Sequence, residues 1–226
     1  MINHIYNKLR IFSRMFALFL FVFLTGCFEY EETIHFEKPF EGYIDISYTV
    51  PLKKNTNESL IRFLPTTRKE VEKKVNQGII SKNLEIQDFR FVKLDVDPEQ
   101  ETIFKRRGNV YYRVSFTDLA ALDSVLIGTL KVKQKGKTLR VKREFNSLHM
   151  DENEEITPGE KKILAESKRL LADGFIKFRV EYPRYSQCYS TKGLLSLGNL
   201  EYTLPLTETL EGGDKIAWEY ILTILY

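Results

Sequence analysis

The sequence has few of the residues on which most catalytic and metal-binding sites depend. Its 226 residues include 3 histidines, 2 cysteines and 1 tryptophan. Two cysteines exclude a disulfide-linked scaffold, and three histidines exclude a histidine-rich metal site. The G-x-G-x-x-G and G-x-S-x-G motifs are also absent. We therefore expect a protein that is not an enzyme and that binds no metal ion, cofactor or mononucleotide.

Two segments match part of a known functional motif but lack a residue that the motif requires. Gly136–Thr138 resembles the end of a phosphate-binding loop, but that motif requires glycine where the sequence has Lys131. The acidic residues at 151–155 have the spacing of a calcium-binding loop, but Ile156 replaces its glycine. His35 and His149 fall on a polar strand face and in a polar loop, so we predict that both are solvated.

A long hydrophobic run is absent as well. The longest run, Met15–Leu24, has ten residues, whereas a helix needs about 20 to cross a bilayer core. Basic residues precede the run with no acidic residue among them, and Gly26 and Cys27 follow it. A basic start, a short apolar centre and small residues at the end are typical of a secretory signal peptide. We assign this role to residues 1–26.

The end of that segment, Leu24-Thr25-Gly26-Cys27, resembles the lipobox of bacterial lipoproteins. The resemblance implies that the chain is cut before Cys27, that the sulfur is diacylated with palmitate-type chains, and that the new amine is acylated. Two or three acyl chains hold a protein on a membrane far more firmly than one. We expect a lipid-anchored protein of the cell membrane or outer membrane that faces the periplasm or the exterior. The alternative is an ordinary cleaved signal with a chance cysteine.

The net charge of the sequence belongs to the signal segment. The formal charge of +3 equals the three basic residues within 1–26, so the rest of the chain is neutral. A neutral chain lacks the positive field of a nucleic-acid-binding protein, and we expect no nucleic-acid partner. With Cys27 acylated, Cys188 has no partner within the chain. It is either a buried small residue or the site of an intermolecular bond.

Alternating residues predict strands directly after Cys27. Apolar and polar residues alternate over 28–36 and over 44–50, which is typical of half-buried strands. Pro39 and Gly42 predict the turn between them. We therefore expect an antiparallel hairpin attached directly to the anchor. Residues 27–226 are predicted to form a single domain anchored through lipidated Cys27.

The rest of the chain predicts further strands and several helices. Strong helix-start and helix-end signals flank two segments, which begin at Thr67 and Thr157. Strands grouped into hairpins, with helices between the groups, are typical of α+β folds. We predict an α+β domain, in which a largely antiparallel sheet of hairpins packs with three or four helices. The strands are expected at 84–96, 109–116, 126–133, 137–145, 175–182, 198–206 and 215–225, and the helices at 58–64, 67–77, 117–122 and 157–173.

The hairpin predicted over 126–145 concentrates positive charge. No acidic residue interrupts its basic residues over 131–143. Near an anionic bilayer each could contribute about 1 kcal/mol, so we propose contact with a membrane or an anionic ligand. The alternatives are a solvated face or protection of a sheet edge. We call this set the basic ribbon: Lys131, Lys133, Lys135, Lys137, Arg140, Lys142 and Arg143.

Aromatic residues make up 13% of the sequence, with 12 tyrosines and 16 phenylalanines. They alternate along the predicted strands, so most are expected in the core. The same residues could line a lipid-sized cavity between a sheet and a helix, and the sequence does not separate these two arrangements. The alternation from Trp218 to Tyr226 predicts a central strand with apolar residues on both sides.

Two segments resemble bacterial envelope lipoproteins of the LppM type. They are Cys27-Phe28-Glu29-Tyr30-Glu31-Glu32-Thr33-Ile34-His35-Phe36 and Glu41-Gly42-Tyr43-Ile44-Asp45-Ile46-Ser47-Tyr48-Thr49-Val50-Pro51. Phe116-Thr117-Asp118-Leu119 and Trp218 fit the same pattern. The resemblance implies an α+β domain in the cell envelope that binds lipid or glycolipid, and it implies no catalytic residue.

Three functions remain open from the sequence. The first is a non-catalytic binding or interaction module for lipid, for anionic envelope ligands or for an envelope protein. The second is a structural or assembly accessory of an envelope protein complex. The third, an enzyme, would require a cleft with converging carboxylates of perturbed pKa.

Overall fold

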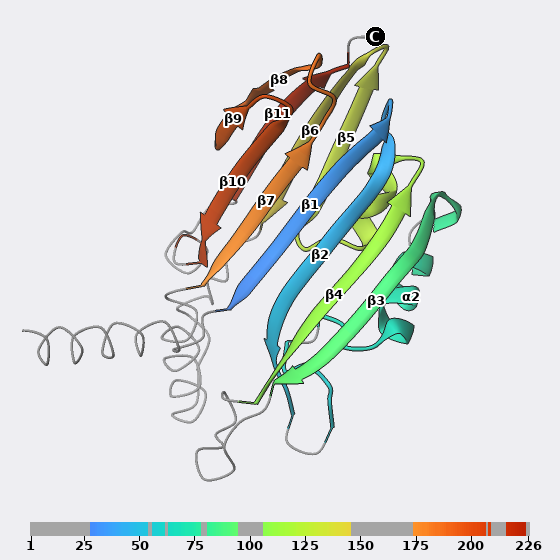
Figure 1. Ribbon diagram of the computed structural model, residues 1–226, viewed down its shortest axis with the longest axis vertical. Helices are drawn as coiled ribbons and strands as arrows, with labels where there is room; N and C mark the ends of the chain where they lie inside the picture. Colours follow the sequence, from blue (N-terminus) through green and yellow to red (C-terminus); the bar gives the residue numbers. More distant parts are fainter. Residues whose placement is uncertain are drawn as a thin grey trace, which may run out of the picture.

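The protein is built mainly from β-strands arranged in two sheets. The computed structural model describes residues 28–53, 56–61, 63–77, 81–94, 106–145, 174–206, 208 and 216–224. The larger sheet has seven strands in the order β3-β4-β2-β1-β7-β10-β9, and the smaller has four in the order β5-β6-β11-β8 (Figure 1).

One half of the large sheet comes from consecutive antiparallel strands. β1 (Glu29–Lys38) and β2 (Glu41–Pro51) form the predicted hairpin, and β2 pairs with β4 (Arg107–Phe116), which pairs with β3 (Leu84–Leu94). Gly42 is required at the start of β2, because a Cβ at this position would overlap the backbone oxygen of His35. The period-two alternation therefore predicted β1, β2 and β4 correctly, and the strand predicted at 84–96 is present as β3.

The other half of the large sheet comes from the C-terminal third of the chain. β7 (Phe175–Glu181) lies parallel to β1, with Glu29 opposite Phe175 and His35 opposite Glu181. β10 (Asn199–Pro205) pairs with β7, and the short β9 (Leu194–Ser196) forms the outer edge. β1 is thus a central strand with one early partner and one late partner.

The small sheet combines the predicted basic hairpin with the C-terminal strand. β5 (Thr129–Lys135) and β6 (Thr138–Phe145) are antiparallel, and β11 (Ile216–Thr223) lies between β6 and β8 (Gln187–Ser190). The central position predicted for the C-terminal strand is confirmed. Its two faces differ, since Trp218, Tyr220 and Leu222 are buried while Glu219 and Thr223 are half-buried.

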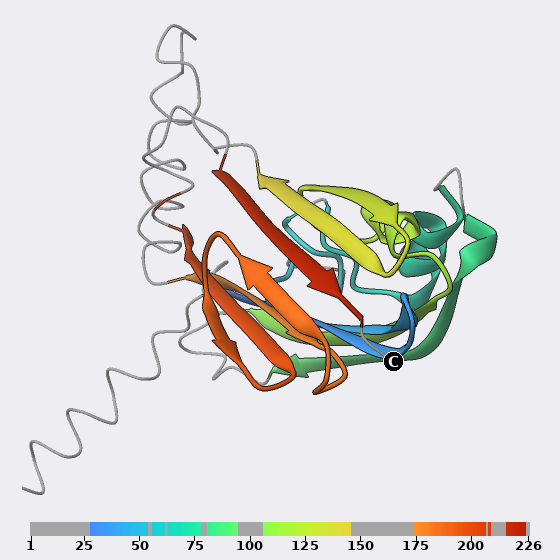
Figure 2. The same cartoon turned by 90° about the horizontal axis from the view of Figure 1, so that it is seen from above.

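The core lies between the two sheets. Figure 2 shows the small sheet covering one face of the large sheet. Buried apolar residues of the large-sheet strands from β4 to β10 lie on the covered face, and an aromatic cluster joins the two sheets. The ring of Trp218 lies 5.3 Å from that of Phe178 and 5.2 Å from that of Tyr202. Phe178, Tyr202 and Trp218 therefore form core, as one of the two sequence interpretations expected.

The same face is covered on its other half by short helices. α2 (Arg68–Gln77) buries Val71 and Val75, and the 3-10 helix η3 (Leu119–Ser124) contacts α2, β4 and β5. The predicted capping box is present, because the Glu70 carboxylate accepts a hydrogen bond from the Thr67 amide and the Thr67 hydroxyl accepts one from the Glu70 amide. A second 3-10 helix, η1 (Ser81–Asn83), precedes β3.

A buried ion pair joins the two sheets. Glu32 of β1 and Arg143 of β6 lie 3.0 Å apart, and Arg143 also donates a hydrogen bond to the Ile127 carbonyl at 2.8 Å. The Tyr30 hydroxyl donates to the Glu32 carboxylate at 2.9 Å. Burial raises the pKa of Glu32, and the charge of Arg143 opposes that shift. The cavity beside the pair measures about 10 Å³, which is the space of one water molecule, so it does not hold a lipid.

The prediction of an α+β fold with three or four helices is wrong. The described part of the chain has one α-helix, α2, and two 3-10 helices, whereas strands form two sheets. No helix forms at 58–61, because Ser59 forms a β-bridge with Leu52 and its hydroxyl binds the backbone of Ile61. The segment at 117–122 forms the 3-10 helix η3. The helix predicted at 157–173 lies outside the described residues.

Two strands, β8 and β9, were not predicted. Both are short and lack a buried residue, so neither shows the alternation that reveals a half-buried strand. Among the described residues, no helix is both long and apolar enough to span a membrane.

Candidate functional site

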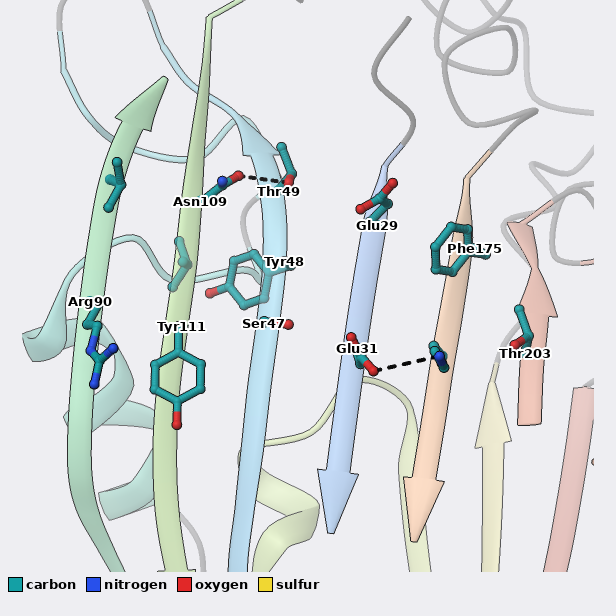
Figure 3. A pocket seen from close by; sticks show the side chains of 13 residues that line it. Glu29, Glu31, Ser47, Tyr48, Thr49, Arg90, Asn109, Tyr111, Phe175 and Thr203 are labelled. Carbon is teal, nitrogen blue, oxygen red and sulfur yellow. Dashed lines mark hydrogen bonds and ion pairs between the residues drawn. The ribbon is translucent and has the colours of Figure 1, made fainter. Parts of the chain in front are cut away.

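The outward face of the large sheet is polar and carries an open groove. In β1, β2, β4 and β7 the residues that alternate with the core residues point away from the small sheet. An open groove of about 580 Å³ lies across this face, at the end where β1 and β7 begin (Figure 3). Its lining is contributed by Glu29, Glu31, Ser47, Tyr48, Thr49, Arg90, Val92, Asn109, Val110, Tyr111, Phe175, Lys177 and Thr203.

The charged groups of the groove are largely paired. The Lys177 ammonium lies 3.2 Å from the Glu201 carboxylate and 4.0 Å from that of Glu31. Arg90 lies 2.6 Å from Asp88 and stacks over the ring of Tyr111 at 5.3 Å. Two acidic and two basic residues line the groove. The groove therefore offers hydrogen-bonding groups without an excess of charge of either sign.

Neutral polar and aromatic groups occupy the floor of the groove. The Thr49 hydroxyl donates a hydrogen bond to the Asn109 side chain at 2.9 Å, and Ser47 lies beside Thr49 on the same face (Figure 3). Phe175 and Tyr111 add ring surface on opposite sides. Hydroxyls, an amide and aromatic rings together suit a polar organic ligand, because they combine hydrogen bonds with stacking.

A hydrogen-bonded network occupies the same face farther along the strands. The His35 imidazole lies between two carboxylates, 3.0 Å from Glu181 and 3.4 Å from Asp45. Asp45 accepts two hydrogen bonds from Arg113, both 2.8 Å long, and one from Tyr111 at 2.7 Å. This network crosses β7, β1, β2 and β4.

The network shifts the pKa values of Asp45 and Tyr111. Burial pushes the pKa of Asp45 upward, but the hydrogen bonds from Arg113 and Tyr111 outweigh it and hold that pKa below its usual value. Burial, followed by the bond to Asp45, raises the pKa of Tyr111. The His35 ring also stacks on Tyr43 at 4.4 Å. His35 is therefore a partly buried cross-strand residue, and the prediction that it is solvated is wrong.

The network ties β7, β1, β2 and β4 together through His35 and Asp45. The acceptor oxygens of Asp45 are used by Arg113 and Tyr111, so this carboxylate is not placed to accept a proton from a substrate. In the described part of the chain, no group of three or more histidine, cysteine or acidic side chains is arranged to hold a metal ion.

The structure divides the predicted basic ribbon. Lys131, Lys133 and Lys135 of β5, with Arg140 and Lys142 of β6, lie on the outward face of the small sheet and are partly or fully exposed. Arg143 points inward to Glu32 and is 2% exposed, so it does not belong to the exposed face. Lys137 lies at the turn between the two strands.

Acidic residues from outside the interval 131–143 neutralise part of the ribbon. Glu144 lies 2.6 Å from Lys131 and 2.7 Å from Lys142, and these contacts lower its pKa to about 2. Glu219 of β11 lies 3.7 Å from Arg140. Among the described residues, Lys133 and Lys135 have no carboxylate within ion-pair distance.

The remaining predicted residues are placed as follows. Cys27 and His149 lie outside the described residues. Phe28 is described, is half-buried against the core, and its carbonyl accepts a hydrogen bond from the Phe175 amide at 3.1 Å. Cys188 is a free cysteine of intermediate exposure, and burial raises the pKa of its thiol. β1, one of the strands that line the groove, thus begins two residues after Cys27.

The sequence did not reveal the groove. Alternating polar residues at 29, 31, 47 and 49 marked the outward faces of two strands, but such faces are usually solvated. The decisive contact is the parallel pairing of β1 with β7, which brings Phe175 and Lys177 beside Glu29 and Glu31. A pairing between such distant segments leaves no signal in a single sequence.

Comparison with known proteins gives limited structural similarity. The NMR structure of the folded domain of LppM from Mycobacterium tuberculosis is 10% identical, with a TM-score of 0.47, and the match covers 88% of this chain and 91% of that one. An M1 zinc metallopeptidase from Deinococcus radiodurans, solved with a Tyr-Ser-Ala substrate, is 9% identical with a TM-score of 0.33. That match covers 86% of this chain and 41% of the metallopeptidase.

At TM-scores below 0.5, these similarities establish neither a shared fold nor a shared function. A comparison with curated protein sequences found no match. A family model gives the clearest result. The model described as LIC11874-like matches residues 22–226, and the chain therefore belongs to the LIC11874-like family.

Proposed function

We propose that the protein is a lipid-anchored binding module of the cell envelope, without catalytic activity, and that the groove on the large sheet binds the polar part of an envelope ligand. The observation that carries the proposal is the position of the groove. Its lining begins at Glu29, two residues after the cysteine of the lipobox. Two residues span about 7 Å, so the groove of an anchored protein lies at the level of the lipid headgroups.

The chemistry of the groove favours a neutral or zwitterionic ligand. Its charged side chains are balanced and mostly paired with each other. A ligand with a strong negative charge would have to displace Glu31 or Glu201 from Lys177, which costs free energy. A glycan or a zwitterionic lipid headgroup instead uses the hydroxyl, amide and aromatic groups of the floor. The volume of about 580 Å³ is within the range of small-ligand sites.

Acylation is tested by intact-mass measurement of the protein extracted from membranes. We expect a chain that begins at Cys27 and carries two or three acyl chains. The Cys27→Ala variant should lack this mass and leave the membrane fraction. An unmodified Cys27 in the native protein would contradict the anchoring, and with it the location in the cell membrane or outer membrane.

Ligand binding is tested with variants that fill the groove. Ser47→Trp places a large ring on the groove floor and leaves the core unchanged, whereas Ser115→Trp makes the same change on the outward face outside the groove lining. The purified full-length protein in detergent would be titrated with glycerophosphocholine, glycerophosphoglycerol and a di-N-acetylglucosamine. We expect binding of the neutral and zwitterionic probes, with loss in Ser47→Trp only. Equal binding by both variants would contradict the proposal.

The basic ribbon supports a second contact with an anionic envelope ligand. Lys133 and Lys135 lie near the tip of the β5–β6 hairpin, which lies at the opposite end of the molecule from the start of β1 (Figure 1). This position favours a ligand other than the anchoring bilayer. Replacing both lysines by glutamine should weaken binding to an anionic polymer such as heparin. Unchanged retention on a heparin column would exclude this contact.

The alternative function is a structural or assembly accessory of an envelope protein complex. It predicts one stoichiometric partner after crosslinking in intact cells, whether or not the groove is filled. Recovery of the same partner by the wild type and by Ser47→Trp would favour this alternative over the binding module.

A further inference from the structure

Several large apolar side chains are exposed along the edge where β8 of the small sheet and β9 of the large sheet are in contact. Leu194, Leu195 and Leu197 are 79%, 48% and 74% exposed, and Tyr185 and Tyr189 are 63% and 64% exposed. All five come from the segment between the end of β7 and the start of β10, which includes β8 and β9 (Figure 1). We call residues 184–197 the apolar edge. Contiguous exposed apolar side chains mark interaction surfaces.

The apolar edge is held in a defined conformation. Leu194 and Leu195 pair with Glu201 and Leu200 in the large sheet. Hydrogen bonds tie the preceding turn to the small sheet, since the Trp218 indole donates to the Ser190 hydroxyl at 2.9 Å and to the Lys192 carbonyl at 3.2 Å. The leucines are therefore presented by ordered backbone, and burying them against a partner requires little further ordering.

Glycine allows the tight turns that expose the leucines. Gly193 and Gly198 have φ angles of +95° and +75°, which L-residues rarely adopt. A Cβ at Gly193 would lie 2.5 Å from the Glu201 carbonyl oxygen. Both ends of β9 are thus fixed, so the intervening leucines cannot turn into the core without breaking the sheet.

The charge of the apolar edge is positive. Arg184 and Lys192 are exposed, and the sequence from 182 to 200 contains no acidic residue. Tyrosine prefers the interface between lipid and water, and leucines flanked by cations are typical of segments that lie in that interface. Arginine and lysine side chains near an anionic bilayer are attracted to its surface charge.

We propose that the apolar edge docks into the headgroup region of the bilayer that holds the anchor, which fixes the orientation of the protein on the membrane. This inference rests on the membrane attachment in the proposed function. Leu195 aligns with Ile34 through the pairings of β10 and β7. It therefore lies about 17 Å along β1 from Glu29 and about 14 Å across three strands. One tilted orientation brings both Glu29 and the apolar edge to the same surface.

The charge favours a bilayer over a second copy of the chain. A two-fold contact through the apolar edge would add two copies of Arg184 and Lys192 to one interface, and Glu201, which lies opposite Leu194, is already paired with Lys177 and Arg179. An anionic bilayer satisfies both the apolar and the charged groups.

The test is depth-dependent fluorescence quenching with full-length protein reconstituted into vesicles. Trp218, the single tryptophan, is 2% exposed, so a second tryptophan reports its own surroundings. The variants are Leu194→Trp on the apolar edge and Lys133→Trp on β5, the opposite edge strand of the small sheet. The vesicles contain phosphatidylglycerol and brominated phosphatidylcholine.

We expect brominated lipid to quench the tryptophan emission of Leu194→Trp more than that of the wild type. The emission of Lys133→Trp should be quenched no more than that of the wild type. The added quenching of Leu194→Trp should disappear when Leu197→Glu is added, because a buried carboxylate opposes insertion. Equal quenching at both positions, or none at 194, overturns the proposal. A second result would also overturn it: no quenching, together with a concentration-dependent dimer that Leu197→Glu abolishes. That result would show that the apolar edge binds a second copy of the chain. Quenching is measured only in protein bound to the vesicles, and the mass of Cys27 is measured separately, so a failure of docking and a failure of acylation give different results.

Discussion

The carboxylate of Glu32 on β1 and the guanidinium of Arg143 on β6 form a 3.0 Å ion pair between the two sheets, with both side chains 3% exposed. Within the described residues, two other nitrogens of the Arg143 guanidinium are buried without a hydrogen-bond partner. The guanidinium carbon lies 5.3 Å from the ring of Phe145 and 5.5 Å from that of Phe178. The pair is thus buried among aromatic rings and is only partly satisfied.

Breaking this pair from one side should destabilise the protein strongly. Glu32→Gln leaves the Arg143 charge buried without a counter-charge, and we expect a loss of about 3–5 kcal/mol in the free energy of unfolding. The double variant Glu32→Gln, Arg143→Met should recover most of that loss, because no charge remains buried. Urea denaturation measures both. Arg68→Ala, which removes an exposed pair with Glu72, is the control and should cost about 0.5 kcal/mol or less.

Gly42 should be among the least replaceable glycines. A Cβ at this position would overlap the His35 carbonyl in the β1–β2 hairpin, so Gly42→Ala must separate the central strands. We expect a loss of about 3 kcal/mol or more in the free energy of unfolding. Gly136→Ala is a matched control, because Gly136 has open space around it and a φ of +59°. It should cost about 1 kcal/mol. Similar melting temperatures for the two variants would contradict this account.

The outward network makes stability depend on the pH through Asp45. Its pKa is lowered in the folded state, so its contribution is present above the unfolded pKa of about 4 and is lost as the pH falls through the folded value. In Arg113→Met the main opposing hydrogen bonds are gone, and burial should raise the pKa of Asp45. Carboxyl-carbon NMR titration measures the shift. Arg90→Met removes a nearby cation that does not bind Asp45, and it should leave the titration almost unchanged.

Cys188 should react slowly in the folded protein. Burial raises the pKa of its thiol, which a hydrogen bond from Tyr182 only partly offsets, and the thiolate is the reactive form. We expect alkylation by iodoacetamide at pH 8 to be slower than in urea by about tenfold. Mass spectrometry of the peptide that contains Cys188 measures the rate independently of Cys27. Equal rates in the two conditions would show that the thiol is accessible and unperturbed.

The sequence predicted the strands that bury one face, and the physical reason is periodicity. In β1, β2, β4, β6 and β7 nearly every second residue is buried and most of the residues between are partly or fully exposed, so each strand has a signal in the chain itself. The same is not true of β9, whose three residues are all exposed. The fold class was wrong because helix signals such as those near Ser59 are local, whereas the bridge from Ser59 to Leu52 depends on the rest of the structure.

The candidate sites likewise combine features that local sequence predicts with features that depend on distant contacts. Local sequence revealed the basic hairpin, but it could not reveal that Glu219 lies 3.7 Å from Arg140 or that Arg143 pairs with Glu32. The groove requires the register between β1 and β7, and the apolar edge requires knowledge of which leucines remain exposed. Each is a property of contacts between segments far apart in the chain.

The parallel pairing of β1 with β7 also has a consequence for the order of assembly. β1, β2, β3 and β4 all lie before residue 117 and can associate while the remainder of the chain is still being synthesised or exported. One side of β1 then has unpaired amides and carbonyls until residues 175–181 arrive. Contacts between such distant segments slow folding, and an unpaired central strand can pair with another molecule. Efficient production of this protein should therefore depend on rapid delivery of its last third, or on a chaperone that covers β1 in the interval.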